Sequence, residues 1–232
     1  MLKTKTRNPA ETQRRLIDAA VRLMLCQGFA ATTVDQICAE AGLTKGSFFH
    51  YFDSKEAIGR AAMDAFARVG MELYSAAWKD PQADPLEQLY ALLEIMMGFT
   101  RQSGDPVTCM VGMLSQEMAR TNRSMREAAV GHLTAWTEMV MRMLAEAKKK
   151  HPPKIDFDPE RVAWMLNSLW QGSMLIAKTR QTPEMIVENL QQARAYVDSL
   201  FTGVPGRSPL PKTQAKFRTP AQSKKTKERN PS

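Results

Sequence analysis

The sequence predicts an all-α protein of nine helices. Strand signals are nearly absent, because no alternating apolar and polar run is bounded by Asn-Gly or Asp-Gly turns. Helix-start signals recur instead. Asp or Thr precedes Pro at 84–85, 105–106, 158–159 and 182–183, and each pair fits an N-cap residue with proline at the first helical position. Between these signals, apolar residues repeat at the three- and four-residue spacings of amphipathic helices.

The chain divides into two helical regions and a tail. Ser54 is the expected cap of the fourth helix, and residues beyond Phe201 are rich in Pro, Lys, Ser and Thr, which predicts disorder. We therefore expect a small domain over 1–55, a larger one over 56–202 and a tail over 203–232. The nine helices are expected over about residues 10–27, 34–41, 45–51, 54–78, 85–102, 106–119, 123–150, 159–179 and 183–202.

The charge of the chain is concentrated at its ends. Of the 232 residues, 32 are Lys or Arg and 24 are Asp or Glu, and the tail alone holds eight of the basic residues and one acidic residue. The middle of the chain is close to neutral. Basic ends on a neutral body suggest a polyanionic partner, most often nucleic acid. A tail that only improves solubility is the alternative for residues 203–232.

The cysteines and the apolar runs indicate an intracellular protein. Cys26, Cys38 and Cys109 are odd in number and widely spaced, so a disulfide framework or a zinc site is not expected, and Cys26 and Cys38 lie on apolar helix faces that predict burial. No apolar run is long enough to span a bilayer, and the N-terminus does not resemble a signal peptide. We expect a cytoplasmic protein that uses no cofactor or metal and does not contact a membrane.

Residues 32–52, "TTVDQICAEAGLTKGSFFHYF", predict two helices joined by a short glycine-containing turn. Gly42 fits a left-handed helix end, and Thr33 and Thr44 fit N-caps. Phe48 and Phe52, four residues apart, would pack the short second helix against the core. Its polar side then faces outward, which is the arrangement of a helix-turn-helix whose second helix enters the DNA major groove. An ordinary helical hairpin is the alternative.

The motif resembles the signature of the TetR family of bacterial transcriptional repressors. The resemblance covers residues 10–60, including "GFAATTV", "AEAGLTKGSFFHYF" and "SKEAI". It implies an all-helical protein with a three-helix DNA-binding head and a larger domain for ligand binding and dimerisation. The chain departs from the family pattern at Phe49, where a Tyr is usual, so that side chain cannot hydrogen-bond a phosphate. The DNA contacts implied by the resemblance are Thr33, Thr44, Lys45, Gly46, Ser47, Phe49, His50, Tyr51 and Lys55.

The larger domain is similar to one subgroup of these repressors, which senses reactive electrophiles. The similar stretches are "CMVGMLSQEMA" at 109–119 and "LWQGSMLIAKTRQTPEMIVENLQQ" at 169–192, and the resemblance places the sensor at Cys109. If Asp105 caps the sixth helix and Pro106 is its first residue, Cys109 lies in the first turn, where the helix dipole favours a thiolate. The alternative is that Cys109 is a small buried hydrophobe.

The sixteen methionines suit a pocket for an apolar ligand of variable shape, because thioethers adapt to their contacts. Most of these residues could equally fill a plain core. The residues that we expect at an effector pocket or sensor are Cys109, Met96, Phe99, Met113, Trp136 and Met139.

The last two expected helices carry an apolar pattern that we assign to a dimer interface, because TetR-like proteins pair these helices with their two-fold mates. The residues concerned are Met165, Leu169, Ile186, Leu190 and Val197. A symmetric dimer would place two helix-turn-helix units on a palindromic operator.

These features predict a repressor that binds double-stranded operator DNA as a homodimer and is released by a small-molecule effector, with an electrophile acting at Cys109 as one form of release. A DNA-binding dimer without an effector is the alternative. An enzyme is not expected, since the chain has no HExxH, GxSxG, GxGxxG or GxxxxGK[ST] motif and its three histidines are scattered.

Overall fold

The computed structural model describes residues 8–80, 82–103 and 107–201, and these residues form nine α-helices and one short 3-10 helix, with no β-strand among them. The helices are α1 (Pro9–Ala31), α2 (Val34–Ala41), α3 (Lys45–Tyr51), α4 (Lys55–Tyr74), η1 (Ser75–Trp78), α5 (Pro85–Ser103), α6 (Met110–Met118), α7 (Arg123–Lys150), α8 (Pro159–Arg180) and α9 (Glu184–Leu200).

The helix ends follow the capping chemistry of the sequence. The Thr33 hydroxyl accepts a hydrogen bond from the Gln36 amide, and the Gln36 side chain accepts one from the Thr33 amide, which makes a capping box at the start of α2. Gly42, at φ 61°, ends α2 in the left-handed conformation. Asp158 caps α8, and Pro159 is the first residue of that helix, as predicted. The predicted bounds of α2, α3 and α7 are confirmed.

Several predicted boundaries need correction. α4 ends at Tyr74 instead of residue 78, and the 3-10 helix η1 follows it. α6 begins at Met110 instead of residue 106, because residues 107–109 are not helical, and Cys109 is its N-cap; Asp105 and Pro106 lie outside the described residues. α9 begins one residue late, with Pro183 at the cap position. α1 continues to Ala31 across an interruption at Gly28, whose φ of 86° and ψ of 168° are not helical.

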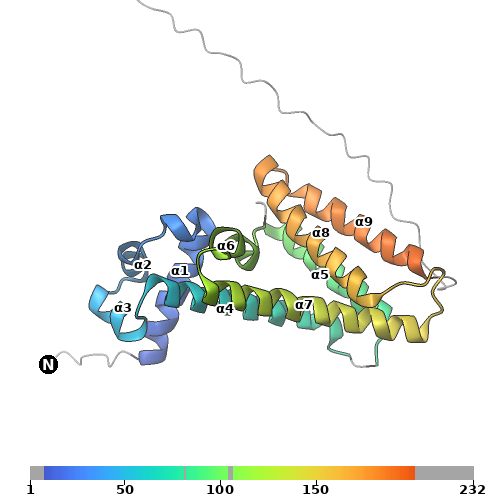
Figure 1. Cartoon of the computed structure of the whole chain (residues 1–232), viewed down its shortest axis with the longest axis horizontal. Helices are drawn as coiled ribbons and strands as arrows, with labels where there is room; N and C mark the ends of the chain where they lie inside the picture. Colours follow the sequence, from blue (N-terminus) through green and yellow to red (C-terminus); the bar gives the residue numbers. More distant parts are fainter. Residues whose placement is uncertain (1–7, 81, 104–106, 202–232) are drawn as a thin grey trace, which may run out of the picture.

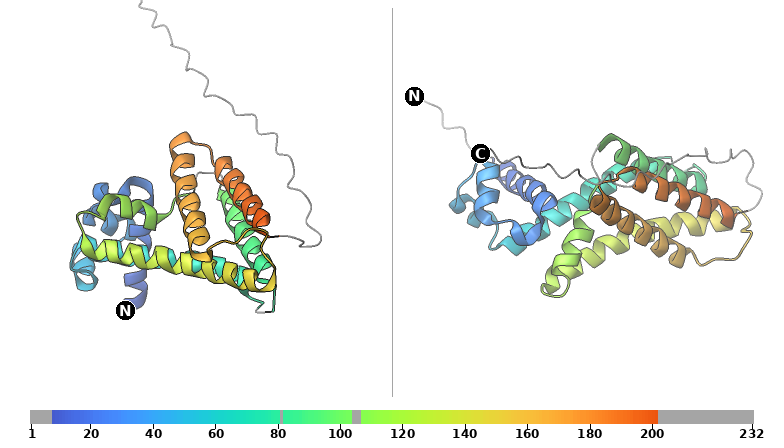
Figure 2. Two further views of the ribbon diagram at one scale, coloured as in Figure 1. Left: turned by 45° about the vertical axis from the view of Figure 1, so that its right-hand side comes forward. Right: turned by 90° about the horizontal axis from the view of Figure 1, so that it is seen from above.

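The helices form a head and a body (Figure 1). α1, α2 and α3 make the head at one end, and α5, α8 and α9 pack together at the other end (Figure 2). α4 and α7 run side by side from one end to the other. Each end has its own hydrophobic cluster, and Cys109 is partly buried against both. α6 belongs with the head cluster through Met110, Val111 and Leu114.

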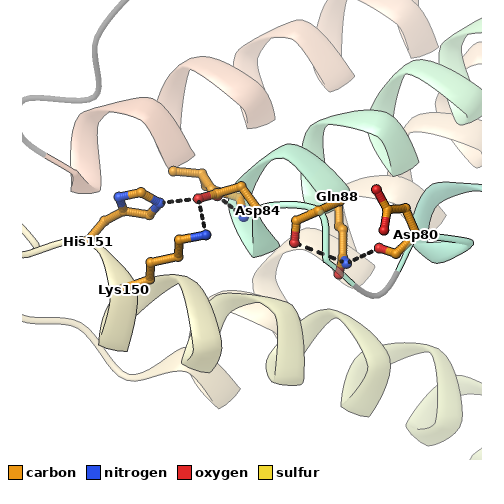
Figure 3. A network of polar contacts seen from close by, with 7 residues as sticks. Asp80, Asp84, Gln88, Lys150 and His151 are labelled. Carbon is orange, nitrogen blue, oxygen red and sulfur yellow. Dashed lines mark hydrogen bonds and ion pairs between the residues drawn. The ribbon is translucent and has the colours of Figure 1, made fainter.

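The end of α7 is fixed to the start of α5 by a polar network around Asp84 (Figure 3). The Asp84 carboxylate caps α5 by accepting from the Leu86 amide. It also lies 2.7 Å from His151 Nε2 and 3.2 Å from Lys150 Nζ. Burial opposes ionisation of Asp84, but the hydrogen bonds from His151, the Leu86 amide and Lys150 outweigh it and lower its pKa. This network closes the end of the body far from the head.

The cysteines Cys26 and Cys38 differ in exposure. Cys26, predicted to be buried, is exposed, whereas Cys38 is buried as predicted, and burial raises the pKa of the Cys38 thiol.

In the part of the chain that the structure describes, no helix is long and apolar enough to cross a membrane. Within the same residues, no three His, Cys, Asp or Glu side chains converge as metal ligands would. The predicted tail lies outside the described residues.

Candidate DNA-reading surface and effector cavity

The short helix α3 is held in place by its apolar side. Phe48 is fully buried and Phe52 is 6% exposed, and both belong to the head cluster together with Ile37. A helix of seven residues gains little stability from its own hydrogen bonds, so this burial fixes its orientation. The opposite side of α3 faces solvent, and Phe49 is 55% exposed there. We call this side the reading surface, and its exposed members are Lys45, Gly46, Phe49 and His50.

Other predicted DNA-contact residues have partners within the head. The Thr44 hydroxyl caps α3 by accepting from the Ser47 amide at 3.2 Å, and Thr33 caps α2 as described above. Tyr51 is half-buried, with its ring edge-on to His50. Lys55 Nζ donates to the Phe29 carbonyl at 3.1 Å. These residues border the reading surface. Thr33, Thr44 and Lys55 also form hydrogen bonds with the backbone around it.

One residue at the reading surface was not predicted. Asp35, in the first turn of α2, pairs with Lys45 across the helix-turn-helix, with 2.8 Å between Oδ1 and Nζ. Its position, ten residues before Lys45, gives no signal of this proximity in the sequence. The folded turn brings the two residues together, and this hydrogen bond raises the pKa of Lys45.

The body contains a cavity of about 210 Å³ between α4, α7 and α8, which we call the central cavity. Its walls are mostly aromatic and aliphatic, with polar side chains at separate points. The lining residues are Asp64, Phe66, Ala67, Arg68, Gly70, Met71, Tyr74, Cys109, Val111, His132, Leu133, Ala135, Trp136, Asn167, Trp170 and Gln171.

Some polar side chains of this cavity have hydrogen-bond partners within the described part of the chain, and one does not. His132 Nε2 lies 2.7 Å from Asp64 Oδ1, and Asn167 donates to the Thr137 hydroxyl at 2.8 Å. Burial raises the pKa of the Tyr74 phenol, so it stays protonated. The indole Nε1 of Trp136, by contrast, is buried and finds no hydrogen-bond partner among the described residues. An unmatched buried donor costs about 1–3 kcal/mol.

Cys109 separates the central cavity from a second one. It is half-buried at the N-cap of α6, and its Sγ accepts a hydrogen bond from Gln171 Nε2 at 3.6 Å. Gly112 permits this contact, because a Cβ there would lie 2.3 Å from Gln171 Oε1. On its other side the thiol borders a cavity of about 240 Å³ lined by Thr108, Cys109, Gly112, Met113, Gln116, Gln171, Met174, Leu175 and Lys178.

The predicted pocket residues do not all meet at one site. Trp136 lines the central cavity and Met113 lines the second cavity. Met139 borders a third opening, beside Trp78, at the far end of the body. Met96 is 1% exposed inside the body core, and Phe99 is 47% exposed, and neither lines these three cavities. A helical repeat shows which residues are apolar but not which helix each one meets. The sequence therefore missed Tyr74, His132, Asn167 and Gln171.

The predicted dimer-interface residues also separate into two groups. Ile186, Leu190 and Val197 are at most 1% exposed inside the body, so the prediction that they face a second copy is wrong. They are buried because that side of α9 packs on α5 and α8. Met165 is exposed and Leu169 is half-buried. The exposed large apolar side chains of the last two helices are Trp164, Met165, Leu175, Ile176 and Tyr196.

Comparison with known proteins finds two family matches and many relatives. Residues 16–62 match the family described as "Bacterial regulatory proteins, tetR family", and residues 85–193 match "Tetracyclin repressor-like, C-terminal domain". "Transcriptional regulator AcuR" of Cereibacter sphaeroides is 30% identical over 169 residues, covering 73% of this chain and 77% of that protein. "HTH-type transcriptional repressor NemR" of Escherichia coli is 24% identical over 191 residues, covering 82% and 94%.

Solved structures show the same architecture. A regulatory protein TetR from Rhodobacter sphaeroides superposes with a TM-score of 0.72 at 27% identity, covering 80% of this chain and 98% of that one. The reduced form of E. coli NemR gives a TM-score of 0.64 at 24% identity, covering 82% and 97%, and supports the fold.

Proposed function

Because the chain belongs to the TetR family of bacterial transcriptional regulators and therefore acts by binding DNA and not as an enzyme, we propose that it is a ligand-released repressor. It binds a palindromic operator as a dimer and leaves when a small molecule occupies the central cavity. The observation that carries this proposal is a mostly apolar cavity in the body that the Cys109 thiol also borders.

In the proposed complex, α3 enters the major groove with the reading surface toward the DNA. Lys45 and Ser47 contact base edges, and the Phe49 ring contacts a thymine methyl or a sugar. Thr33, Thr44, Tyr51 and Lys55 stand at the margin, where they contact phosphates. Gly46 supports this geometry, because a Cβ there would meet nothing of this chain closer than 3.8 Å, so its small size serves the approach of a partner. His50 completes the exposed side of α3.

The dimer forms through the exposed side of α8, with α9 beside it. Leu175 is 50% exposed and Ile176 is 45% exposed, and Trp164 and Met165 continue the same apolar strip toward the start of the helix. Gly172 lies between them, and a Cβ there would meet nothing within 4 Å, which leaves room for a closely packed second helix. A two-fold dimer then presents two reading surfaces to major grooves spaced about 34–36 Å, or a multiple of that distance, along the duplex.

The cavity favours a small, largely apolar effector with a hydrogen-bond acceptor. Its walls include Phe66 and Trp170, and the protonated Tyr74 phenol among its lining residues is a hydrogen-bond donor. An α,β-unsaturated carbonyl compound meets both requirements and adds to Cys109. In that step the thiol first loses its proton to solvent. The sulfur then bonds to the β-carbon, the carbon–carbon π bond breaks, and the α-carbon takes a proton.

Release requires the effector to bind two conformations unequally. The central cavity is bounded by α4, which starts in the head at Lys55, so a change of the cavity walls shifts the head through α4. An effector that favours the releasing conformation by about 1–3 kcal/mol lowers operator affinity by about 5- to 150-fold.

The first experiment measures the affinity of the purified protein for duplex DNA from upstream of its own coding region, before and after treatment with a small α,β-unsaturated aldehyde. A Cys26→Ser background removes the exposed competing thiol. We expect weaker binding after treatment, and no such change in the additional Cys109→Ser variant. Binding that the aldehyde weakens equally in both contradicts sensing at Cys109.

A second arm separates a non-covalent sensor from a protein with no effector. In a thermal-shift screen of small carbonyl compounds, we expect a ligand to raise the melting temperature of Cys109→Ser, because a ligand that binds only the folded state stabilises it. A protein that binds operator DNA but responds to no compound in either arm is the DNA-binding dimer without effector.

A further inference from the structure

Glu117, near the end of α6, contacts the head directly. Its carboxylate accepts hydrogen bonds from two successive backbone amides of α1, from Phe29 at 3.2 Å and from Ala30 at 2.9 Å. The partners are 88 and 87 residues apart in the sequence. Hydrogen bonds to a charged acceptor are about twice as strong as those between neutral groups. This contact therefore ties the end of α6 to the end of α1.

Glu117 fits an interruption in α1 that exposes those amides. Gly28 has φ 86° and ψ 168°, so the helical hydrogen-bond pattern breaks there and the amides that follow resemble the unpaired donors of a helix start. A Cβ at Gly28 would lie 2.8 Å from Glu117 Oε1. The glycine thus allows both the backbone conformation and the close approach of the carboxylate.

The same two residues are held from the opposite direction by the head. Lys55 Nζ donates to the carbonyls of Phe29 at 3.1 Å and of Ala30 at 3.4 Å, and it lies 4.4 Å from the centre of the Phe29 ring. The last turn of α1 therefore has its amides on a body residue and its carbonyls on the first residue of α4. A displacement of Glu117 would therefore act on a turn that Lys55 also binds.

This turn also connects to the start of α2. The Thr32 hydroxyl donates to the Gly28 carbonyl at 2.7 Å, and Gln27 Nε2 donates to Gln36 Oε1 at 3.1 Å. Gln36 is the capping-box partner of Thr33. A movement of the α1 end thus reaches the first turn of α2, which positions the helix-turn-helix.

The other end of α6 lies at the proposed effector site. Cys109 is the N-cap of α6 and borders both cavities, and Glu117 stands eight residues later in the sequence. At 1.5 Å per residue this helix is a rod of about 12 Å between the two. Leu114, between them, is fully buried in the head cluster. α6 is therefore one continuous helix packed against the head, with Cys109 at one end and Glu117 near the other.

We infer that Glu117 is a positioning residue that couples α6 to the helix-turn-helix through the last turn of α1, in addition to the path through α4. The inference deepens the proposed function, because it names the contact by which an event at Cys109 reaches the reading surface. Coupling between two sites is reciprocal, so DNA bound to the head must also stabilise α6 through the same carboxylate.

The reciprocal effect allows a test that needs no effector. Amide hydrogen exchange is measured by mass spectrometry with and without duplex DNA from upstream of the coding region, in wild type, Glu117→Ala and Glu127→Ala. Glu127 is the matched control, because it is an exposed glutamate that pairs with Arg123 on α7. We expect DNA to slow exchange in residues 110–118 about fivefold or more in wild type and in the control.

In Glu117→Ala we expect DNA to slow exchange in residues 34–51 as in wild type but to leave residues 110–118 unchanged. Undiminished protection of residues 110–118 in this variant overturns the inference, as does wild-type protein in which DNA binding leaves α6 unaffected. If Glu117→Ala does not fold, Glu117→Gln keeps the side-chain shape and one acceptor, and it must show at least a twofold smaller effect. Failure of effector release is a separate outcome, because it appears as unchanged operator affinity after treatment at Cys109.

Discussion

Asp35 and Lys45 form an ion pair across the helix-turn-helix, with 2.8 Å between Oδ1 and Nζ. Both side chains are more than 60% exposed, so the pair contributes little to stability. Its importance lies in its place, because Lys45 is the first residue of the helix that reads DNA. In the free protein the aspartate neutralises a cation that the duplex needs, and phosphates and base edges must compete for it.

Replacing Asp35 with Asn therefore strengthens DNA binding. The change frees Lys45 and removes a negative charge near the phosphates, so we expect affinity for operator and for random duplex to rise about three- to tenfold, with a salt slope steeper by about 0.9 if Lys45 gains a phosphate. Fluorescence anisotropy across a salt series measures both. A Glu40→Gln variant, on the same helix but paired with Arg22, is the control. Weaker binding by Asp35→Asn contradicts the proposal.

Two neighbouring phenylalanines should respond oppositely to truncation. Phe48 is fully buried in the head cluster, so Phe48→Ala is expected to cost about 3–5 kcal/mol of unfolding free energy. Phe49 is mostly exposed and has its ring edge-on to Phe48 at 5.2 Å, so Phe49→Ala is expected to cost about 1 kcal/mol or less while weakening operator binding about tenfold. Denaturant unfolding and DNA titration measure the two effects. An unaltered operator affinity in folded Phe49→Ala removes this residue from the interface.

The Asp84 network makes stability depend on acidity. The folded state lowers the pKa of Asp84, so its carboxylate stabilises the fold above the unfolded pKa of about 3.9. That contribution is lost as the pH falls below this value and through the folded pKa. We expect Asp84→Asn to be less stable than wild type by about 1 kcal/mol at pH 7, and the difference to vanish toward pH 2. Urea unfolding of wild type and Asp84→Asn across this pH range measures the difference, and a difference that stays constant down to pH 2 contradicts it.

The proposed dimer interface predicts a change of oligomeric state. Introducing a charge at Leu175 or Ile176, both about half exposed on α8, should give monomers and weaken binding to a palindromic site, since the two heads are no longer linked. Sedimentation measures the mass and anisotropy measures the binding. Gln192→Glu, which introduces a charge on the exposed side of α9, is the variant used for comparison. A charged variant that stays dimeric places the interface elsewhere.

The sequence leaves two roles open for the basic tail, residues 203–232, which are contact with DNA phosphates or improved solubility alone. Deleting it should reduce the slope of log affinity against log salt by about 0.9 for each phosphate contact that is lost. Random duplex is the better probe here, because specific contacts do not hide the effect. An identical slope for the shortened chain means that the tail is a solvated extension.

The sequence predicts the head better than the body, for a physical reason. Thr33, Gly42 and Thr44 are local signals that fix where α2 and α3 start and end, and the buried side of Phe48 follows from helical spacing. The predicted start of α6 at residue 106 is wrong. The Asp-Pro pair at 105–106 resembles an N-cap followed by a first helical proline, but the helix begins at Met110.

In the body, periodicity identifies apolar faces without naming their partners. Ile186 and Ile176 read alike in the sequence, yet the structure buries the first inside the chain and exposes the second. The central cavity depends on contacts between α4, α7 and α8, which no local pattern specifies. The ion pair of Asp35 and the reach of Glu117 to α1 likewise depend on tertiary approach.

The interruption of α1 at Gly28 has a consequence for how the molecule divides mechanically. A division near residue 55 treats α1 as one rigid member of the head. However, the turn after Gly28 is bound through its amides to α6, and the turns before it are not. A division at residue 55 therefore cuts across a direct contact, because the last turn of α1 is tied to α6. Any side chain at Gly28 would disturb this contact as well as the backbone, because a Cβ there would lie 2.8 Å from Glu117 Oε1.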